Sequence, residues 1–313
     1  MNLVVVGGAN IDVCAKSSAK IIHRDSNIGK VDFTLGGVGR NIAEDLSLFG
    51  ADVSLLTAIG DDSFGRVVID NAHEQGITLL AEPFEGKKTG VYAYLADGDG
   101  TFVAGISDME IVDMITPQVI EENINALFFA DAIIVDSNLP RETIERLCEK
   151  DFKIIGDGVS STKCLKFSGV LDKLYMMKLN RIEAFALTDT DNVTDAVKVL
   201  VNKGCKRGII TLGEQGAMCY EEKVDGTHTY WLSNLPNPKI CDTNGCGDAF
   251  LAGFVFAMMR GRNMKESLCF GQSAASLNAE SLSSVNRTMS FHGLKIVGEK
   301  FKEEADSREE IIK

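Results

Sequence analysis

A glycine-rich turn and a carboxylate stand together in the stretch CDTNGCGDAFLAGF, residues 241–254, directly before an apolar helix pattern. The backbone N–H groups of such a turn can point the same way. At a helix N-terminus they add to the unsatisfied donors and to the positive end of the helix dipole. We therefore expect Gly245, Cys246 and Gly247 to form an anion hole, in which the glycines supply conformational freedom and Cys246 is the small residue between them.

Asp248 follows this turn immediately, and its negative charge would repel an anionic ligand. We interpret it as a base that takes a proton from an attacking hydroxyl, while the hole stabilises the charge on a transferring phosphoryl group. An alternative is that Asp248 only favours the helix dipole in the first turn. A P-loop is excluded, because no Lys-Ser or Lys-Thr pair follows the glycines.

A second glycine-rich turn occurs in LGGVGRNIAEDLSLFGADVSLLTAIGDDSFG, residues 35–65, before a helix pattern, a strand pattern and an acidic turn. Gly36, Gly37 and Gly39 permit a second ligand to approach the backbone closely. Asn41 lies in the first turn of the helix, where its amide can both donate to and accept from sugar hydroxyls. A tightly packed helix cap is the alternative interpretation of this stretch.

The acidic composition argues against polyanionic partners. The 313 residues include 32 basic and 45 acidic side chains, which gives a formal net charge of −13. Such a surface repels phosphate backbones and anionic lipid, so we expect neither nucleic acid nor membrane as a partner; a local backbone nest can still bind a small anion. The length allows one large α/β domain or two modest ones.

Targeting and metal-binding patterns are missing from the sequence. The opening residues MNLVVVGG lack a basic region and predict a strand rather than a signal peptide. No apolar stretch approaches the roughly 20 residues that span a bilayer. The eight cysteines contain no CxxC pair and the four histidines lie far apart. We therefore expect reduced, mostly buried thiols and a cytoplasmic protein.

Short apolar runs alternate with helical patterns along most of the chain. This alternation predicts a parallel sheet that helices cover on both faces. We expect strands at 3–7, 53–60, 132–136, 153–157, 174–179 and 207–213, and helices at 40–49, 141–149, 192–202, 247–260 and 264–279. Ligands of such sheets bind at the carboxyl ends of the strands. At or just after such ends we place Asp12, Asp136, Asp157, Asn180 and Gly213.

Three segments depart from this alternation. Residues 13–35 and 88–106 are predicted to be extended, and ADGDGT within the second is a hairpin signal. We interpret them as a small β-lid that projects from the sheet edge; an ordinary edge hairpin is the alternative. The tail EKFKEEADSREEIIK, residues 299–313, is predicted to be a charged amphipathic helix with a solvated face, and we assign it no function.

The two glycine-rich motifs resemble the signatures of the ribokinase-like (PfkB) carbohydrate and nucleoside kinases. Their order and their separation of about two hundred residues also match, and the similarity covers residue 3 to about 290. The resemblance implies a single domain over residues 1–313. Its expected fold is a three-layer α/β/α ribokinase-like fold with a mainly parallel central sheet and a small β-lid. It also implies a phosphotransferase with an alcohol group as acceptor, which uses ATP and Mg²⁺.

On the phosphate side, the resemblance implies that Asp248 is the catalytic base and that the amides of the 245–247 turn surround the transferring phosphate. Asp242 and Asn244 stand where the family often places ligands for a monovalent cation. Asn244 replaces a common Thr and Cys246 replaces a common Ala. These departures leave potassium dependence open.

For the nucleotide and its metal ion, the resemblance points to three further elements. KLNRIEAF, residues 178–185, resembles the family's Asn-x-x-Glu element, in which Asn180 and Glu183 would orient Mg²⁺ and phosphate through water. From the residues alone, the same pair indicates a helix capping box. The turn TLGEQG (211–216) and the segment GQSAASLNAES (271–281) would contact ATP through Thr211, Gly213, Ala275 and Asn278.

On the acceptor side, Asp12 in GGANIDV matches the family's aspartate that pairs with ribose hydroxyls. A carboxylate can accept both hydrogen bonds of a vicinal diol, which explains the residue type. The resemblance implies that Gly37 and Asn41 complete this wall, and Asn10 is a further candidate.

Three segments, GGVGRNIAEDL, GISDMEIVDMITP and DSNLPRETI, resemble the pseudouridine kinases within the family. They place Ser107 and Asp108 near the base, where either residue could accept from the extra N–H of the uracil ring of pseudouridine. They place Asn138 near the acceptor. Ser107 or Asp108 could instead cap the helix that follows.

The expected reaction is transfer of the γ-phosphate of ATP to the 5′-hydroxyl of pseudouridine, giving pseudouridine 5′-phosphate and ADP. The alternatives are a kinase for ribose, adenosine, inosine or another ribose-bearing acceptor, and a non-catalytic nucleotide-binding regulator on the same fold. A dinucleotide-binding Rossmann domain ranks last, because no suitably spaced G-x-G-x-x-G and acidic residue follow the first strand. Since lids in this family often pair, the resemblance also implies a homodimer through the lid, although exposed strand edges can be covered within one chain.

Overall fold

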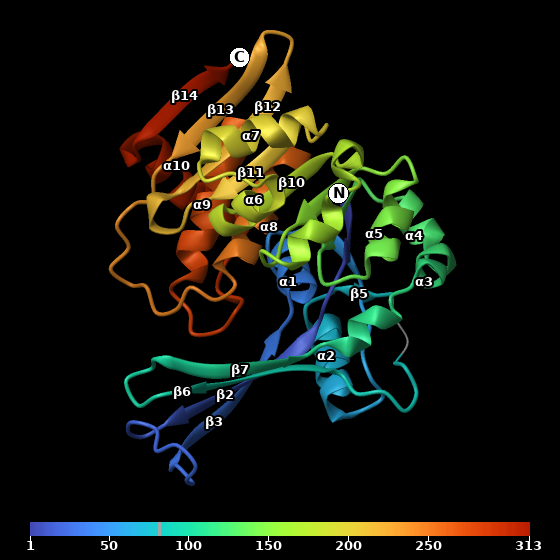
Figure 1. Ribbon diagram of the computed structural model, residues 1–313, viewed down its shortest axis with the longest axis vertical. Coiled ribbons are helices and arrows are strands. Elements are labelled where there is room, and N and C mark those ends of the chain that lie inside the picture. The colour runs from blue at the N-terminus through green and yellow to red at the C-terminus, as the bar shows by residue number, and fades with distance from the viewer. Residues whose placement is uncertain (81–82) are drawn as a thin grey trace.

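A ten-stranded sheet runs through the centre of the computed structural model, which describes residues 1–80 and 83–313. Its strand order is β14-β13-β12-β11-β10-β9-β8-β1-β4-β5 (Figure 1). The strands from β11 to β5 are parallel: Arg207–Thr211, Met176–Asn180, Ile154–Asp157, Ala132–Asp136, Asn2–Val6, Asp52–Leu56 and Thr78–Leu79. The other three form an antiparallel edge: β12 (Ala217–Lys223), β13 (Gly226–Leu232) and β14 (Ser307–Ile312).

Helices cover both faces of this sheet, because the parallel strands are buried on both sides and each side carries its own apolar cluster. One cluster contains residues of α1 (Val38–Leu48), α8 (Cys246–Met259), α9 (Met264–Asn278) and α10 (Phe291–Glu304). The other contains residues of α3 (Pro117–Glu122), α4 (Ile124–Phe128), α5 (Arg141–Cys148), α6 (Arg181–Thr188) and α7 (Val193–Asn202). The predicted α/β layers are thereby confirmed.

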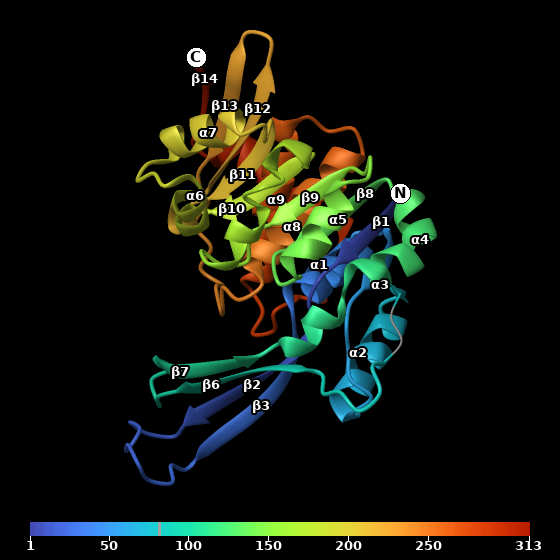
Figure 2. The same ribbon diagram turned by 45° about the vertical axis from the view of Figure 1, so that its right-hand side comes forward.

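A separate four-stranded sheet projects from the main body beside helix α2 (Ser63–Glu74), as Figures 1 and 2 show. Its strand order is β3-β2-β6-β7, with bounds Gly29–Gly36, Asn10–Ser17, Gly90–Ala96 and Phe102–Asp108. The ADGDGT signal forms the β6–β7 turn, in which the N–H of Asp97 donates to the carbonyl of Thr101 at 2.9 Å. This sheet corresponds to the predicted lid, and β2 extends it toward the N-terminus to Asn10.

The register of the lid sheet sorts its side chains onto two different faces, because successive strand residues point to opposite sides. Asp12 is paired with Tyr92 and Thr34, and Tyr92 is paired with Ser107, so these four side chains share one face. The other face carries almost only apolar side chains: Val31, Phe33, Leu35, Ile11, Val13, Ala15, Val91, Ala93, Leu95, Ala104 and Ile106, with Asp108 at its end. The lid is therefore amphipathic.

The predicted helix over the whole C-terminal tail is wrong. Helix α10 ends at Glu304, and residues 307–312 form β14, which pairs with β13 along the sheet edge. The strand is stabilised by contacts across the sheet that a local pattern does not contain. The guanidinium of Arg308 lies 5.8 Å from the ring centre of Trp231, and Glu309 forms an ion pair with Lys265.

Two further properties concern the chain as a whole. In the ranges 1–80 and 83–313, no helix has both the length and the apolar character that crossing a bilayer requires. All eight cysteines lie within these ranges and are free thiols, and the buried ones are Cys148, Cys164, Cys205, Cys219 and Cys269.

The described residues also include four short 3₁₀ helices. They are η1 (Glu110–Met114), η2 (Lys163–Phe167), η3 (Leu171–Lys173) and η4 (Gly213–Gln215). Of these, η2 follows β9 and η4 follows β11, so both lie at the carboxyl edge of the parallel strands, where ligands of such sheets bind.

Candidate active site

The N-terminus of α8 has the backbone conformation that its glycines predict. Gly245 is the residue before the helix and is left-handed, with φ 74°. A Cβ atom at this position would lie 1.8 Å from the carbonyl oxygen of Ser284, so only glycine fits. The N–H of Cys246 donates to the carbonyl of Thr243 at 3.2 Å. Cys246 is thus committed to the turn itself, and Gly245 and Gly247 are the better candidates for anion contacts.

Asp248 lies in the first turn of α8 and is 9% exposed. Its Oδ2 accepts a 2.6 Å hydrogen bond from Nδ2 of Asn41 on α1, a residue 207 positions earlier in the chain. Burial is the largest cause that raises the pKa of Asp248, to about 7, and the charge of Asp157 adds to the rise. Lys178 and the Asn41 bond act in the opposite direction. A carboxyl with this pKa can exchange a proton near neutral pH, as a general base must.

Lys178 is a site residue that the sequence analysis missed. It is buried in β10, and its Nζ lies 2.9 Å from Oδ2 of Asp157 and 3.2 Å from the point where a Cβ of Gly247 would stand. Burial alone would lower the pKa of this lysine, but the carboxylates of Asp157, Glu183 and Asp248 raise it above its ordinary value. A permanent cation therefore lies against the glycine turn. The available signal was a lysine inside the apolar run LYMMKL.

The strand ends carry the acidic residues that the sequence places there, but with different roles. Asp136 ends β8 and is fully buried, and its Oδ2 accepts from the N–H groups of Gly8 at 2.8 Å and Gly39 at 3.0 Å. It joins the loop after β1 to the start of α1. Asp157 ends β9 and pairs with Lys178. Asp12 is an exception to the prediction, since it lies within lid strand β2 rather than at an end of the central sheet.

Asn180 and Glu183 form a capping box at the start of α6. The side chain of Asn180 accepts from the backbone N–H of Glu183 at 2.9 Å. The carboxylate of Glu183 accepts from the backbone N–H and from the side-chain amide of Asn180. Glu183 is 2% exposed, and burial raises its pKa. Within the described ranges no group of three or more acidic, His or Cys side chains could hold a metal ion directly.

This donor set nevertheless fits a hydrated Mg²⁺, which keeps several waters and takes one or two carboxylates together with substrate phosphates. Carboxylate oxygens that accept one hydrogen bond retain lone pairs for a water ligand. Around Lys178, the carboxyls of Asp157, Glu183 and Asp248 outnumber its single positive charge. Such a surplus of acidic groups favours a cation.

We call Leu35 and Gly36, the last two residues of β3 before the turn to α1, the lid hinge. On the lid side, Asp12 lies over this hinge. A Cβ at Gly36 would stand 2.4 Å from Oδ2 of Asp12, so the carboxylate occupies the space above this glycine. Its Oδ1 accepts from Nδ2 of Asn10 at 2.7 Å, and burial raises its pKa. Gly37 follows with φ 98°, and a Cβ there would meet the carbonyl of Gly8 at 2.4 Å. Of the residues predicted to form the acceptor wall, Asp12 and Gly37 lie together around this hinge, with Asn10 beside them.

The structure separates Ser107 from Asp108. Ser107 shares the face of Asp12, while Asp108 pairs with Val91 on the opposite face. Neither residue caps the following helix, since η1 begins after Met109 without a side-chain cap. The period of two along a strand prevents both side chains from facing the same base.

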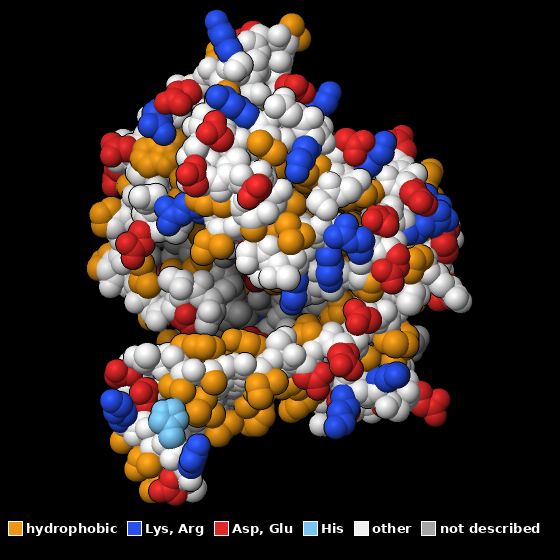
Figure 3. Space-filling model, in the orientation of Figure 1, with side chains coloured by type: hydrophobic (Ala, Val, Ile, Leu, Met, Phe, Trp, Pro, Cys, Tyr) orange, Lys and Arg blue, Asp and Glu red, His pale blue; other side chains and the backbone are white. Residues whose placement is uncertain are grey.

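The face of Asp12 also carries an aromatic row that the sequence analysis did not use. The rings of Tyr92 and Tyr94 stack with centres 5.8 Å apart, and Phe102 continues the row 6.5 Å from Tyr94. The pKa of Tyr94 is raised mainly by its contact with the Cys14 thiol, and the charges of Asp242 and Asp12 contribute. Because Asp242 belongs to the main body, this lid face looks toward the body. Figure 3 shows the surface hollowed between the two.

Asn138 is held by a lysine that the sequence did not single out. Nζ of Lys163 on η2 donates to Oδ1 of Asn138 at 2.6 Å, and the amide of Asn138 lies beside Gly8. Nζ of Lys166 donates to the carbonyls of Asn138 and Leu139 at 3.1 and 2.7 Å. The loop that follows the carboxyl end of β8 is therefore polar and carries the positive charges of Lys163 and Lys166.

The predicted nucleotide residues are only partly brought together. Thr211 ends β11, and Gly213 follows it with φ 62° and open space around its Cβ position. Ala275 is half-buried on α9. Asn278 is fully buried, and its amide donates to the carbonyls of Asn244 and Ser284, each at 3.1 Å. Its side chain braces the glycine turn and is not free to line an adenine pocket.

Asp242 folds back on its own turn. Its Oδ1 accepts from the N–H of Asn244 at 3.0 Å and its Oδ2 from the side-chain amide of Asn244 at 3.2 Å. Asn244 thus gives this carboxylate two hydrogen bonds within the motif.

Comparisons with known proteins identify the family and the fold. The family described as pfkB family carbohydrate kinase matches residues 1–289. The pseudouridine kinase of Escherichia coli (strain K12) is 30% identical over 285 residues, 88% of this chain and 89% of that protein. The ribokinase of Bacillus subtilis (strain 168) is 26% identical over 286 residues, 88% of this chain and 92% of that protein.

A solved carbohydrate kinase from Agrobacterium tumefaciens superposes with a TM-score of 0.85 and 25% identity, over 99% of both chains. The ribokinase-like fold is therefore confirmed, with the small sheet as its lid. The chain belongs to the pfkB family of carbohydrate kinases, phosphotransferases that act on hydroxyl groups and use ATP with Mg²⁺.

Proposed function

We propose that this protein transfers the γ-phosphate of ATP to the 5′-hydroxyl of pseudouridine, giving pseudouridine 5′-phosphate and ADP. The observation that carries the proposal is the position of Asp248. It is buried at the N-terminus of α8, has a pKa of about 7 and lies beside the cation of Lys178. A base, an anion hole and a cation at one point are what phosphoryl transfer to an alcohol requires.

In the proposed step, Asp248 takes the proton of the acceptor hydroxyl as its oxygen attacks the γ-phosphorus. A new O–P bond forms, and the bond from the γ-phosphorus to the β–γ bridging oxygen breaks, with its electron pair leaving on ADP. The amides of Gly245 and Gly247 and the ammonium of Lys178 stabilise the charge on the transferring group. When bound, Mg²⁺ would neutralise phosphate charge, held through water by Asn180 and Glu183.

The inner face of the lid supports a nucleoside acceptor. Asp12 can bind the ribose diol, and the stacked rings of Tyr92 and Tyr94 lie on the same face. An aromatic row offers a flat apolar surface to a base, which plain ribose lacks. Ser107 also lies on this face and could accept from the extra N–H of pseudouridine, whereas Asp108 does not. The 30% identity to a pseudouridine kinase supports the same acceptor.

An acceptor panel tests the substrate. We expect kcat/KM with Mg-ATP to be highest for pseudouridine, lower for uridine, adenosine and inosine, and lowest for ribose. Ser107→Ala should reduce the preference for pseudouridine over uridine, because uridine lacks the N–H that Ser107 would bind. Equal or better use of plain ribose would overturn the nucleoside assignment and favour the ribokinase alternative, which the 26% identity to a ribokinase keeps in view.

The base is tested by Asp248→Asn, which is nearly isosteric and removes the ability to accept a proton. We expect turnover to fall by a factor of about 10²–10⁴, while ATP binding and the melting temperature stay close to wild type. Retained turnover would exclude the base role. A wild-type protein that binds ATP but phosphorylates none of the acceptors would favour the non-catalytic regulator.

The assembly and conditions form part of the proposal. We infer a homodimer through the apolar outer face of the lid, where Val31, Phe33 and Ile106 are 56%, 61% and 75% exposed. Figure 3 shows hydrophobic side chains gathered over the lid strands. Such a patch commonly marks a protein interface.

Potassium dependence is expected to be weak because the side chain and the backbone N–H of Asn244 occupy the carboxylate of Asp242. The free thiols are consistent with a protein of the reducing cytoplasm.

A further inference from the structure

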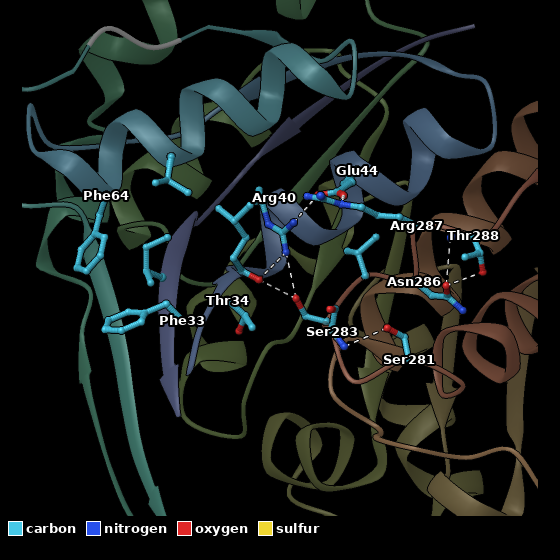
Figure 4. A pocket seen from close by; sticks show the side chains of 15 residues that line it. Phe33, Thr34, Arg40, Glu44, Phe64, Ser281, Ser283, Asn286, Arg287 and Thr288 are labelled. Carbon is cyan, nitrogen blue, oxygen red and sulfur yellow. Dashed lines mark hydrogen bonds and ion pairs between the residues drawn. The ribbon is translucent and has the colours of Figure 1, made fainter. Parts of the chain in front are cut away.

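A cavity of about 480 Å³ lies between the lid hinge and the main body, and Arg40 stands in its wall (Figure 4). The cavity is lined by the end of β3, by α1, by α2 and by the loop 281–288. Although Arg40 borders this space, it is only 2% exposed. A buried guanidinium must find hydrogen-bond acceptors, and the elements around it supply them.

The guanidinium of Arg40 connects three parts of the protein. Its Nη2 donates to the carbonyl of Leu35 at 2.9 Å and its Nε to the carbonyl of Gly36 at 3.2 Å, the last two residues of lid strand β3. Nη2 also donates to Oγ of Ser284 at 3.1 Å, on the loop that packs against the glycine turn. Nη1 forms an ion pair with Glu44. The lid hinge, helix α1 and this loop therefore meet at one side chain.

The same guanidinium donates to Oδ1 of Asn41. The single hydroxyl proton of Ser284 is closer to the carbonyl of Leu35, at 2.8 Å, than to this oxygen, at 3.3 Å. With its oxygen engaged by the guanidinium, the Asn41 side chain must turn its Nδ2 in the other direction, where it donates to Asp248 at 2.6 Å. The reverse orientation would set an amide N–H against the guanidinium and an oxygen against the carboxylate. Both contacts would be repulsive.

We propose that Arg40 is a positioning residue for the phosphoryl-transfer reaction: it holds the Asn41 amide in the orientation that binds Asp248 and ties this orientation to the lid hinge. Arg40 does not reach the substrate in this scheme and acts through Asn41. The inference rests on the proposed function, because it presupposes that Asp248 is the base. The carbonyls of Leu35 and Gly36 are thereby connected through Arg40 to the hydrogen bond between Asn41 and Asp248.

Glu44 provides a matched control. It is fully buried, and it pairs with Arg40 through Oε2 and with Arg287 through Oε1, at 2.6 Å from Nε of Arg287. Replacing either arginine by methionine leaves Glu44 with one cationic partner. Only Arg40→Met removes the guanidinium that donates to Asn41. Arg287→Met therefore reproduces the damage to the ion pair without touching the route to Asp248.

The other charged groups near Asp248 are expected to keep their state in both variants. Asp157 and Lys178 lie on β9 and β10, and Asp136 lies on β8, outside the contacts of Arg40. Asp45 on α1 is fully buried, and in the described part of the chain its carboxyl oxygens have no hydrogen-bond partner. Burial raises its pKa well above the usual range, the charge of Asp248 adds to the rise, and Arg40 lowers it, so removing Arg40 favours the neutral form further.

The test is the pH dependence of kcat for wild type, Arg40→Met, Arg287→Met, Asn41→Ala and the double variant Arg40→Met/Asn41→Ala. Loss of the hydrogen bond from Asn41 to Asp248 removes an interaction that lowers the pKa of Asp248. The acid limb, which is the part of the profile where kcat rises with pH, should therefore move to higher pH. We expect a shift of about one unit for Arg40→Met, which lowers turnover at pH 7 about fivefold. Arg287→Met should leave the limb in place. The double variant should match Asn41→Ala alone.

An unshifted limb in Arg40→Met, an equal shift in Arg287→Met, or additive effects in the double variant would each overturn the proposal. If Arg40→Met does not fold, Arg40→Lys can be measured in its place. It keeps a cation for Glu44, but its single ammonium group cannot reach all the acceptors of the guanidinium, so it should shift the acid limb in the same direction. Turnover retained by Asp248→Asn would instead refute the proposed function itself, so the two failures are distinguishable.

Discussion

At the scale of residues, the reactivity of Asp248 is a balance between opposing neighbours. Burial and the charge of Asp157 raise its pKa, while Lys178 and the Asn41 bond lower it. A solvent-exposed aspartate would be too weak a base for an alcohol at neutral pH, and an unopposed buried one would stay protonated. A pKa of about 7 lies between these extremes.

The first prediction concerns the pH profile. Because Asp248 must be deprotonated to act, kcat/KM for the acceptor should rise with pH through about 7 in the wild type. Asp157→Asn removes the like charge and should move this acid limb to lower pH. A steady-state profile from pH 5 to 9 checks both values. A limb that stays near 4 would contradict the assignment of Asp248 as the titrating group.

A second prediction concerns Lys178. Lys178→Met removes the cation beside the glycine turn, so transition-state charge is less well stabilised and kcat/KM should fall about 10²-fold. The same change removes an interaction that lowers the pKa of Asp248, so the acid limb should move upward, opposite to Asp157→Asn. Shifts in the same direction for both variants would refute this electrostatic account.

At the scale of elements, the glycine turn before α8 is held from outside the helix. Gly245 packs on the carbonyl of Ser284, and Asn278 on α9 bridges that carbonyl to Asn244. The turn is therefore rigid before any ligand arrives. Preorganised donors cost no reorganisation when charge develops on the phosphoryl group.

This leads to a prediction at both ends of α8. Gly245→Ala should displace the loop at Ser284 and abolish most activity. It should lower the free energy of unfolding by more than about 2 kcal/mol. Gly261→Ala is the matched control, since Gly261 also has a positive φ, 82°, but open space around its Cβ position. It should cost only about 1–2 kcal/mol and leave kcat unchanged. Chemical denaturation and initial rates measure the two effects; equal losses of activity would contradict the packing argument.

At the scale of the whole molecule, the amphipathic lid has two chemically different surfaces. The face of Asp12 and Tyr92 looks toward the main body, and the opposite face exposes aliphatic and aromatic side chains. A chain with a net charge of −13 resists non-specific association, so an apolar surface of this kind favours a specific partner. A second lid is the partner we propose.

The corresponding prediction is that Ile106→Lys converts the proposed dimer to a monomer, because a charge would be buried at the interface. Phe128→Lys is the control, since Phe128 is 73% exposed on α4, comparable with the 75% of Ile106, but lies outside the lid. Sedimentation equilibrium distinguishes the two states. A wild type that is monomeric, or a dimer that Phe128→Lys also breaks, would exclude the lid interface.

Much of the architecture could be predicted from the sequence because it depends on local periodicity. The run LVVVG predicts a buried strand, and α8 and α9 begin within one residue of the predicted positions. The glycine turn before α8 could be recognised because only glycine tolerates φ 74° against the Ser284 carbonyl. The tail could not, since β14 depends on pairing with β13 and on contacts with Trp231 and Lys265.

The sequence by itself determined the order of elements, the glycine turns and the choice of Asp248 as the candidate base, because each follows from residues that are neighbours in the chain. Only the tertiary structure decided which of these residues meet. It brought Asn41 to Asp248 across 207 positions, set Lys178 against the glycine turn and turned Ser107 and Asp108 to opposite faces of the lid. These relations depend on sheet order and strand register, and distant packing decides both.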